Sequence, residues 1–341
     1  MNDGTMLANK MKLRNAYVTH KTRQGVVNSY FDDKPWLLVT PKVIRQQAAF
    51  EAAKNFKAAW SNKRAGNIDT FKMKFKSKRT KGYVLGIEKN VTFADDTLLI
   101  PCIGPVRFFE KPPIDHKPEA ECTIQRDARG DFWLQVPVYR RVKPAQGAHT
   151  LAIDPGVRIP FSCYSPDGRQ AYLEGLDMKE RIDAIQGRVA AVDRRLAAST
   201  DASERRKLRR HRVALFKKYQ NVRDDCHWKI IHQMTQQYST ILLPHLESSR
   251  LCGGLRAKSN RHMFGISHYL FQERMKQKCE EHSVRLVEAD ESYSSKTCGA
   301  CGWQHATLGG NEVFRCGACG LRCHRDLHAA RNIYLRWAAA S

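Results

Sequence analysis

The chain has 341 residues, and its 58 Lys and Arg against 34 Asp and Glu give a formal net charge of +24 at pH 7. A hydrophobic content of 42% beside 27% charged residues is ordinary for a globular protein, which excludes a wholly disordered basic tail. The length predicts about two domains, and the positive surplus predicts a polyanionic partner, for which nucleic acid ranks above an anionic membrane.

Neither a membrane span nor a secretory signal is expected. Apolar runs such as Thr240–Leu243 are far shorter than the roughly 20 residues of a spanning helix. Residues 1–14 lack the apolar centre of a secretory signal. The eleven cysteines include two Cys-x-x-Cys pairs, which in a reducing compartment indicates metal binding rather than disulfides. We therefore expect a soluble, intracellular protein with no membrane partner.

The first domain is predicted to span residues 1–147 and to mix helix with short strands. Helical spacing of apolar residues over Pro41–Trp60 predicts an amphipathic helix. Strict alternation over Phe71–Lys78 predicts a strand with one cationic face. Ten Lys and Arg accompany one acid between residues 54 and 81, which favours contact with phosphates over a merely solvated lysine face. The expected contact residues are Lys72, Lys74, Lys76, Lys78 and Arg79.

The second domain is predicted to span residues 148–341 and to have an α/β pattern. A strand over Phe132–Val138 and the turn-rich segment Lys143–Gly147 precede it. The predicted elements are strands over Leu151–Ile153, Thr240–Leu243 and Val284–Ala289 and near Arg169–Leu173, a helical stretch over 178–237 and a helix over His268–His282.

The helical stretch 178–237 is predicted to form a hairpin. Its break at Ala198–Ala202 offers Ser199 or Thr200 as the N-cap of the second arm. Nine Lys and Arg and no acid lie between residues 205 and 223, so this arm is a second candidate surface for a nucleic-acid backbone. The expected contact residues are Arg205, Arg209 and Arg212.

Two matched Cys-Gly-Ala-Cys-Gly knuckles predict a structural zinc ribbon. The expected ligands are Cys298, Cys301, Cys316 and Cys319. Each Cys-x-x-Cys turn brings two thiolates to one metal, and the glycine after it permits a left-handed turn. A redox dithiol would show one such pair, and Cys323 and His324 are not needed as ligands. A closed four-thiolate site leaves no open position, so it explains folding rather than catalysis.

Catalysis is therefore expected from carboxylates. Asp154 directly follows the predicted strand Leu151–Ile153, and Asp326 lies in the first turn of a predicted C-terminal helix. Two acids from the two ends of one α/β unit can converge on divalent cations, as in nucleases that clamp the attacking and leaving oxygens of a phosphodiester. The alternative is that each aspartate only caps a turn or a helix.

These motifs together resemble the TnpB/Fanzor family. The resemblance rests on Ile153–Gly168, on the paired cysteine knuckles, and on the stretch from Arg325 to Ile333, and it covers roughly residues 35–341. That family comprises transposon-associated, RNA-guided DNA endonucleases related to the type V CRISPR effectors. The resemblance implies an RNase-H-like (RuvC) nuclease domain, with the zinc ribbon, residues 296–322, inserted before its last helix. It also implies an N-terminal mixed α/β wedge or recognition domain.

The third carboxylate departs from the family's pattern. TnpB proteins place a glutamate directly after the fourth strand, whereas here Pro244 follows Thr240–Leu243, and the nearest acid is Glu247. Glu291 ends the next predicted strand, which resembles the Fanzor branch, so Glu291 is preferred and Glu247 is the runner-up. The last motif also carries His324 and His328 where the family usually has Asp and Asn, and the N-terminus looks shorter than the family's.

The resemblance implies a Mg²⁺-dependent, RNA-guided DNA endonuclease with Asp154, Glu291 and Asp326 as catalytic residues. Its expected partners are an omega-type guide RNA and double-stranded target DNA, and the protein is expected to be monomeric. The expected location is the nucleus if the Fanzor-like interpretation holds, and otherwise the cytoplasm or nucleoid. One alternative is a catalytically inactive RNA- or DNA-binding regulator derived from such a nuclease. A transposase acting directly on DNA ends lacks a Tyr or Ser nucleophile motif in the sequence.

Overall fold

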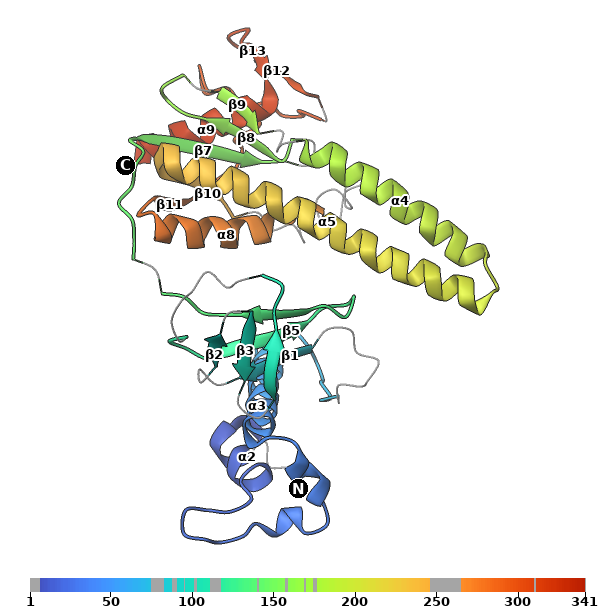
Figure 1. The fold of residues 1–341 in the computed structure, drawn as a ribbon. Helices are drawn as coiled ribbons and strands as arrows, with labels where there is room; N and C mark the ends of the chain where they lie inside the picture. Colours follow the sequence, from blue (N-terminus) through green and yellow to red (C-terminus); the bar gives the residue numbers. More distant parts are fainter. Residues whose placement is uncertain are drawn as a thin grey trace. The chain divides into compact units, whose positions relative to one another are not determined.

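The computed structural model describes residues 7–74, 83–87, 91–94, 96–100, 103–110, 118–139, 141–156, 159–168, 170–173, 177–245, 265–309 and 311–340. The chain divides into two compact units, Met1–Tyr139 and Arg140–Ser341 (Figure 1). The turn-rich segment at which the sequence placed the domain boundary, residues 143–147, therefore belongs to the second unit. No helix within the described ranges is both long and apolar enough to cross a membrane.

The first unit combines helices with two small antiparallel sheets. Helix α2 (Lys10–Tyr17) contacts the long helix α3 (Lys42–Arg64), and two short 3₁₀ helices, η1 (Ser29–Phe31) and η2 (Pro35–Val39), lie between them in sequence. One sheet has the order β1 (Tyr83–Ile87), β5 (Cys122–Arg126), β6 (Phe132–Gln135), and the other has β2 (Thr92–Ala94), β3 (Thr97–Ile100), β4 (Gly104–Arg107). Ile87, Leu98 and Cys122 are buried in a core shared by both sheets.

The prediction of a strand over Phe71–Lys78 is wrong for residues 71–74, the half of this segment that the structure describes. Residues 71–74 form neither helix nor strand, and residues 75–78 lie outside the described residues. Phe71 packs edge-on against Phe56 and Trp60 of α3, with ring centroids 5.6 and 6.4 Å away. Alternation alone cannot make a strand, because a strand also needs a ladder partner, and Phe71 is instead anchored by aromatic contacts.

The second unit is built on one mixed sheet. Its strand order is β11 (Arg285–Ala289), β10 (Tyr238–Pro244), β7 (His149–Pro155), β8 (Phe161–Tyr164), β9 (Gln170–Leu173). Strands β7, β8 and β9 form an antiparallel meander, whereas β10 pairs parallel with both β7 and β11. Strand β8 was not predicted, because a run of four residues directly after Pro160 is too short to show a period.

Alternate residues of the central strands face two different helical layers. Ile153 and Ile241 are fully buried in the core formed with the helical hairpin and with α8 (His268–Glu281). Ala152 and Leu242 point to the opposite face and pack against Ile333 of α9 (Arg325–Ala340). Because side chains alternate along a strand, both faces are apolar and both are covered, which gives an α/β/α arrangement (Figure 1).

Helices α4 (Met178–Ala198) and α5 (Ala202–Gln237) pack side by side as a hairpin (Figure 1). The N-cap of α5 is Asp201, whose carboxylate accepts hydrogen bonds from the backbone N–H groups of Ser203 and Glu204, so the prediction of Ser199 or Thr200 is wrong. Ser199 instead ends α4 and donates its hydroxyl to Glu204 at 2.6 Å. The Asp201 carboxylate is a favourable N-cap because its negative charge also interacts with the positive end of the α5 helix dipole.

Replacing the observed cap is expected to weaken the hairpin. Asp201→Ala removes both side-chain hydrogen bonds and should lower the free energy of unfolding by about 1 kcal/mol. Thr200→Ala, at the neighbouring cap position considered from sequence, should change it by less than about 0.5 kcal/mol. Urea unfolding followed by circular dichroism measures both variants, and a larger loss in Thr200→Ala would contradict the assignment.

Candidate active site and metal centre

Asp154 enters the candidate active site from the central strand β7. It lies within the strand, which ends at Pro155, rather than directly after it as the sequence suggested. Being two residues from Ala152, it points to the same face of the sheet, the one covered by α9. The turn that follows is tight, since a Cβ at Gly156 would come within 2.6 Å of the Ile159 carbonyl oxygen. The glycine at position 156 therefore allows the chain to make this tight turn directly after Asp154 and Pro155.

Asp326 and Glu291 reach the same region from two other elements. Asp326 lies in the first turn of α9, with 16% of its side chain exposed. Glu291 is partly buried in the turn just beyond β11, two residues past the end of that strand. Strands β7, β10 and β11 are parallel, so their carboxyl ends share one edge of the sheet. This topology brings Glu291 to the same edge of the sheet as Asp154, and α9, which covers that face, supplies Asp326.

The charges of Asp326 and Glu291 act on Asp154. Burial, and after it the charges of Asp326 and Glu291, raise the pKa of Asp154 to about 8, against an opposing effect of Arg325. Burial and the neighbouring Asp290 likewise raise the pKa of Glu291. Carboxyl groups in such a site ionise together only when a cation compensates their charge. Carboxylate oxygens are the ligands that Mg²⁺ prefers, so the chemistry of these three side chains suits a divalent cation. Within the described ranges, however, the four cysteines are the only such group whose ligand atoms already lie close enough together to share one ion.

Arg325 is the cation next to this group. Its Nε donates to a carboxylate oxygen of Asp326 at 3.1 Å, and a guanidinium N–H also reaches the backbone oxygen of Gly309. The runner-up for the third acid, Glu247, lies outside the described residues. Its contribution therefore stays a prediction.

A pocket of about 330 Å³ adjoins Asp326 and is lined mainly by acidic side chains. The sequence analysis did not predict this group of acids. His324 also borders it, as do acids from the start of α4. The complete lining is Ile159, Pro160, Asp177, Lys179, Glu180, Asp183, Glu312, His324 and Asp326. The available signal was the spacing of Asp177, Glu180 and Asp183, which puts three acids on one side of a helix.

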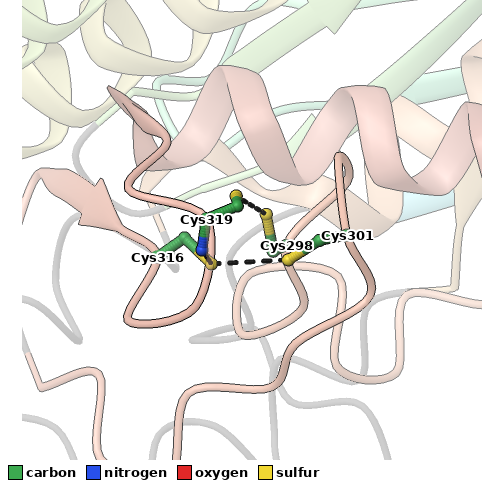
Figure 2. Close-up of side chains that lie close together, drawn as sticks. All are labelled: Cys298, Cys301, Cys316 and Cys319. Carbon is green, nitrogen blue, oxygen red and sulfur yellow. Dashed lines mark hydrogen bonds between the residues drawn. The ribbon is translucent and has the colours of Figure 1, made fainter.

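Four cysteine sulfurs form a compact cluster in the C-terminal part of the chain (Figure 2). The sulfurs of Cys298 and Cys319 are 3.7 Å apart and those of Cys301 and Cys316 are 3.6 Å apart. A tetrahedral ion with metal–sulfur bonds of about 2.3 Å requires sulfurs about 3.8 Å apart, whereas a disulfide requires about 2 Å. The donor set and its spacing therefore fit a structural metal ion.

The backbone of the two knuckles matches the predicted geometry. Gly302 and Gly320, which follow the second cysteine of each pair, have φ of 78° and 73°, which confirms the left-handed turns. The N–H groups of Ala318 and Cys319 donate to the Cys316 sulfur at 3.4 Å. Cys323 is not one of the four clustered residues and packs in the small apolar core beneath them.

The two histidines that depart from the family's last motif make local contacts. His324 accepts a hydrogen bond from the backbone N–H of Asp326, at 3.3 Å. His328 stacks on Phe314 and contacts the first knuckle, where its Nε2 accepts from the Gly299 N–H at 3.1 Å. Both therefore help to join α9 to the cysteine ribbon.

The basic residues named from sequence have different environments. Arg205 donates to the carbonyls of Leu196 and Ser199 and so caps the end of α4, while Arg212 forms a 2.6 Å ion pair with Asp193. Arg209 is exposed, as are Lys72 and Lys74 of the first unit. Lys76, Lys78 and Arg79 lie outside the described residues. Two of the three hairpin arginines thus have structural partners within the protein.

Known proteins resemble this chain in sequence and in fold. The family model described as Cas12f1-like, TNB domain, matches residues 268–333. A transposase-like protein of Paramecium bursaria Chlorella virus 1 is 47% identical over 342 residues, 99% of this chain and 79% of that protein. A TnpB-like protein of Acanthamoeba polyphaga mimivirus is 23% identical over 303 residues, 85% of this chain and 56% of its own length, so the chain spans little more than half of that relative.

A solved structure extends the likeness to the fold. The cryo-EM structure of a Cas12f1–sgRNA–target DNA complex has a protein chain with a TM-score of 0.53 and 12% sequence identity, covering 97% of this chain and 80% of that one.

Metal content distinguishes the clustered cysteines from their neighbour. Cys301→Ser removes one of the four thiolates and should lower the bound metal from about one ion per chain to a small fraction of that. Cys323→Ser, which changes a packed sulfur outside the cluster, should retain the ion. Mass spectrometry of the metals in each purified variant is the measurement, and equal losses in both would count against a four-cysteine site.

Proposed function

Since this chain belongs to the TnpB family, we propose that it is a transposon-associated, RNA-guided DNA endonuclease. The observation that carries this proposal is that the charges of Asp326, from α9, and of Glu291, from the turn after β11, act on the buried carboxyl group of Asp154 in β7. The strand order, with three antiparallel strands followed by two parallel ones, supports an RNase-H-like (RuvC) nuclease domain. We propose the first unit as the wedge or recognition domain.

The three carboxylates would hold Mg²⁺. The bound cations would activate water and stabilise the oxygen that leaves when the phosphodiester is cleaved. Asp154 is held on a central strand, whose neighbours on both sides fix its direction. Asp326 is held by the start of α9 and by its ion pair with Arg325. Glu291 is placed by the turn after β11, where its side chain is partly buried.

Zinc is the metal we propose for the four-cysteine cluster. Four thiolates form a closed set around one ion, so the ion would stabilise the fold of the ribbon without contacting substrate.

Guide RNA and target DNA are the proposed partners. The charge of +24 supports a polyanionic partner, and the Cas12f1 chain of similar fold was solved with both an sgRNA and a target DNA. In such systems base pairing selects the sequence while the protein contacts the backbone. Arg209, Lys72 and Lys74 are exposed and suited to that contact. An omega-type guide and a single protein copy per complex complete the proposal, with a nuclear location if the Fanzor-like interpretation holds and otherwise one in the cytoplasm or nucleoid.

Substitution of the acids tests the catalytic assignment. Asp154→Asn and Glu291→Gln should each lower Mg²⁺-dependent DNA cleavage by about 100-fold or more, because each removes a metal ligand worth several kcal/mol in the transition state. Glu247→Gln is the matched control and should retain most of the activity. The assay uses the protein purified with its own RNA.

Different outcomes separate the competing assignments. Full activity in Glu291→Gln together with loss in Glu247→Gln would transfer the third role to Glu247. Tight RNA binding with no cleavage in the unaltered protein would instead identify an inactive regulator.

Two arginines one helical turn apart should differ in their effect on RNA binding. Arg209→Gln removes an exposed charge and should lower RNA affinity and reduce the slope of log K against log salt by about 1. Arg205→Gln removes the cap of α4 and should mainly lower the melting temperature. Filter binding at several salt concentrations and thermal unfolding compare the two, and an unchanged salt slope in Arg209→Gln would exclude it from the interface.

A further inference from the structure

The segment from Asp290 to Gly299, here called the linking turn, connects the candidate active site to the cysteine cluster. Glu291 lies near its start and Cys298 near its end. Backbone hydrogen bonds fold it tightly, from Ser294 N–H to the Glu291 carbonyl at 3.0 Å and from Thr297 N–H to the Tyr293 carbonyl at 2.9 Å. These hydrogen bonds restrict the backbone conformations available between Glu291 and Cys298.

Asn332 of α9 holds the middle of the linking turn. Its side-chain Nδ2 donates to the carbonyl oxygens of Ser294 and Thr297, both at 2.7 Å. The side chain is buried, with only 9% of the residue exposed, so these bonds are protected from competing water. One amide thus uses both its N–H groups on the segment between Glu291 and Cys298.

The first cysteine knuckle packs closely against the side-chain amide of Asn332. A Cβ added at Gly299 would come within 2.4 Å of the Asn332 Oδ1. Arg331 donates to the Gly299 carbonyl at 3.2 Å, and Arg336 donates to the Ser292 carbonyl at 2.6 Å. These contacts place Asn332 between the ribbon and the turn that carries Glu291.

The linking turn also contains a strained residue. Tyr293 has a φ of 60°, a left-handed conformation that a bulky side chain rarely adopts, and 62% of the residue is exposed. Such strain persists only where surrounding contacts impose it. With its own side chain largely in solvent, Tyr293 is held by the backbone bonds of the turn and by the α9 contacts. Loss of those contacts would let the turn relax and carry Glu291 away.

We propose that Asn332 is a positioning residue that holds Glu291 in the carboxylate group and couples the cysteine cluster to the divalent-cation site. This inference rests on the part of the proposed function that assigns divalent cations to Asp154, Glu291 and Asp326. Residues that orient metal ligands typically change metal affinity by 10- to 100-fold when substituted. Asn332 touches neither metal site, so its effect must pass through the linking turn.

Manganese binding tests the proposal on the full chain. Asn332→Leu removes both N–H donors at similar volume and without adding charge, and it should raise the Mn²⁺ dissociation constant by about 10-fold or more. Ile333→Val is the matched control, because it removes a buried methyl from the adjacent position of α9, which faces the sheet, and it should change the constant by less than about twofold. Isothermal titration calorimetry gives both values, and Asp154→Asn identifies the heat that belongs to the carboxylates.

Gly299→Ala gives a second perturbation of the same amide from the ribbon side. It should weaken Mn²⁺ binding in the same direction, and it keeps the test valid if Asn332→Leu does not fold. Unchanged Mn²⁺ affinity in a folded Asn332→Leu or Gly299→Ala, or an equal loss in Ile333→Val, would overturn the proposal.

Cleavage separates this inference from the proposed function. In Asn332→Leu the Mg²⁺ concentration for half-maximal cleavage should rise, while the rate at saturating Mg²⁺ stays near that of the unaltered protein. A protein that never cleaves DNA but follows the Mn²⁺ pattern would retain the inference and lose the proposed function. If the unaltered protein cleaves DNA but Asn332→Leu leaves the Mn²⁺ affinity unchanged, the proposed function would be retained and the inference about Asn332 lost.

A double-substitution cycle tests the coupling to the cysteine cluster. Cys319→Ser weakens the cluster at the knuckle that lies away from the linking turn, and it should reduce Mn²⁺ affinity when Asn332 is present. In the Asn332→Leu background, Cys319→Ser should have little further effect on Mn²⁺ affinity, because the contacts between the cysteine ribbon and the linking turn through Asn332 are already lost. Additive losses would contradict the coupling.

Discussion

The carboxyl group of Asp154 is buried where the charges of Asp326 and Glu291 act on it, and much of the second unit positions these three side chains. Burial, and after it the charges of Asp326 and Glu291, raise the pKa of Asp154 to about 8, so the charged form of Asp154 is unfavourable unless a cation compensates it. Such a group persists only on rigid supports. Strand β7 is paired on both sides, α9 covers one face, and the linking turn is hydrogen-bonded along its length.

Positive charge in the second unit is not confined to one helix. Exposed basic residues occur on both arms of the hairpin, for example Arg194 on α4 and Arg209 on α5. Acids from the start of α4 border the pocket beside Asp326, and Lys179 lies among them. Arg205 and Arg212 belong to the hairpin's own structure, so charge counts overstate the surface that is free to bind.

The cysteine ribbon is joined to the candidate active site by more than sequence adjacency. His328, Arg331 and Asn332 of α9 all contact the Thr297–Gly299 segment, and the same helix begins with Arg325 and Asp326. A structural metal site and a carboxylate site that share one helix and one turn form a single mechanical unit. In the proposal made above, this arrangement lets the four-cysteine cluster affect cation binding at the carboxylates without taking part in the reaction.

The sequence by itself determined the local features that short-range spacing encodes. The four cysteines with their left-handed glycines, the long amphipathic helices and the apolar strands all follow from periods and pairs of nearby residues. Asp154, Glu291 and Asp326 were also named from motifs, yet only the tertiary structure showed that they interact, because parallel strands bring distant segments to one edge. The cap at Asp201, the missing strand at residues 71–74, the acidic pocket and the role of Asn332 depend on which partner a side chain finds. Spacing along the chain cannot specify such partners, since they are chosen by packing between elements far apart in sequence.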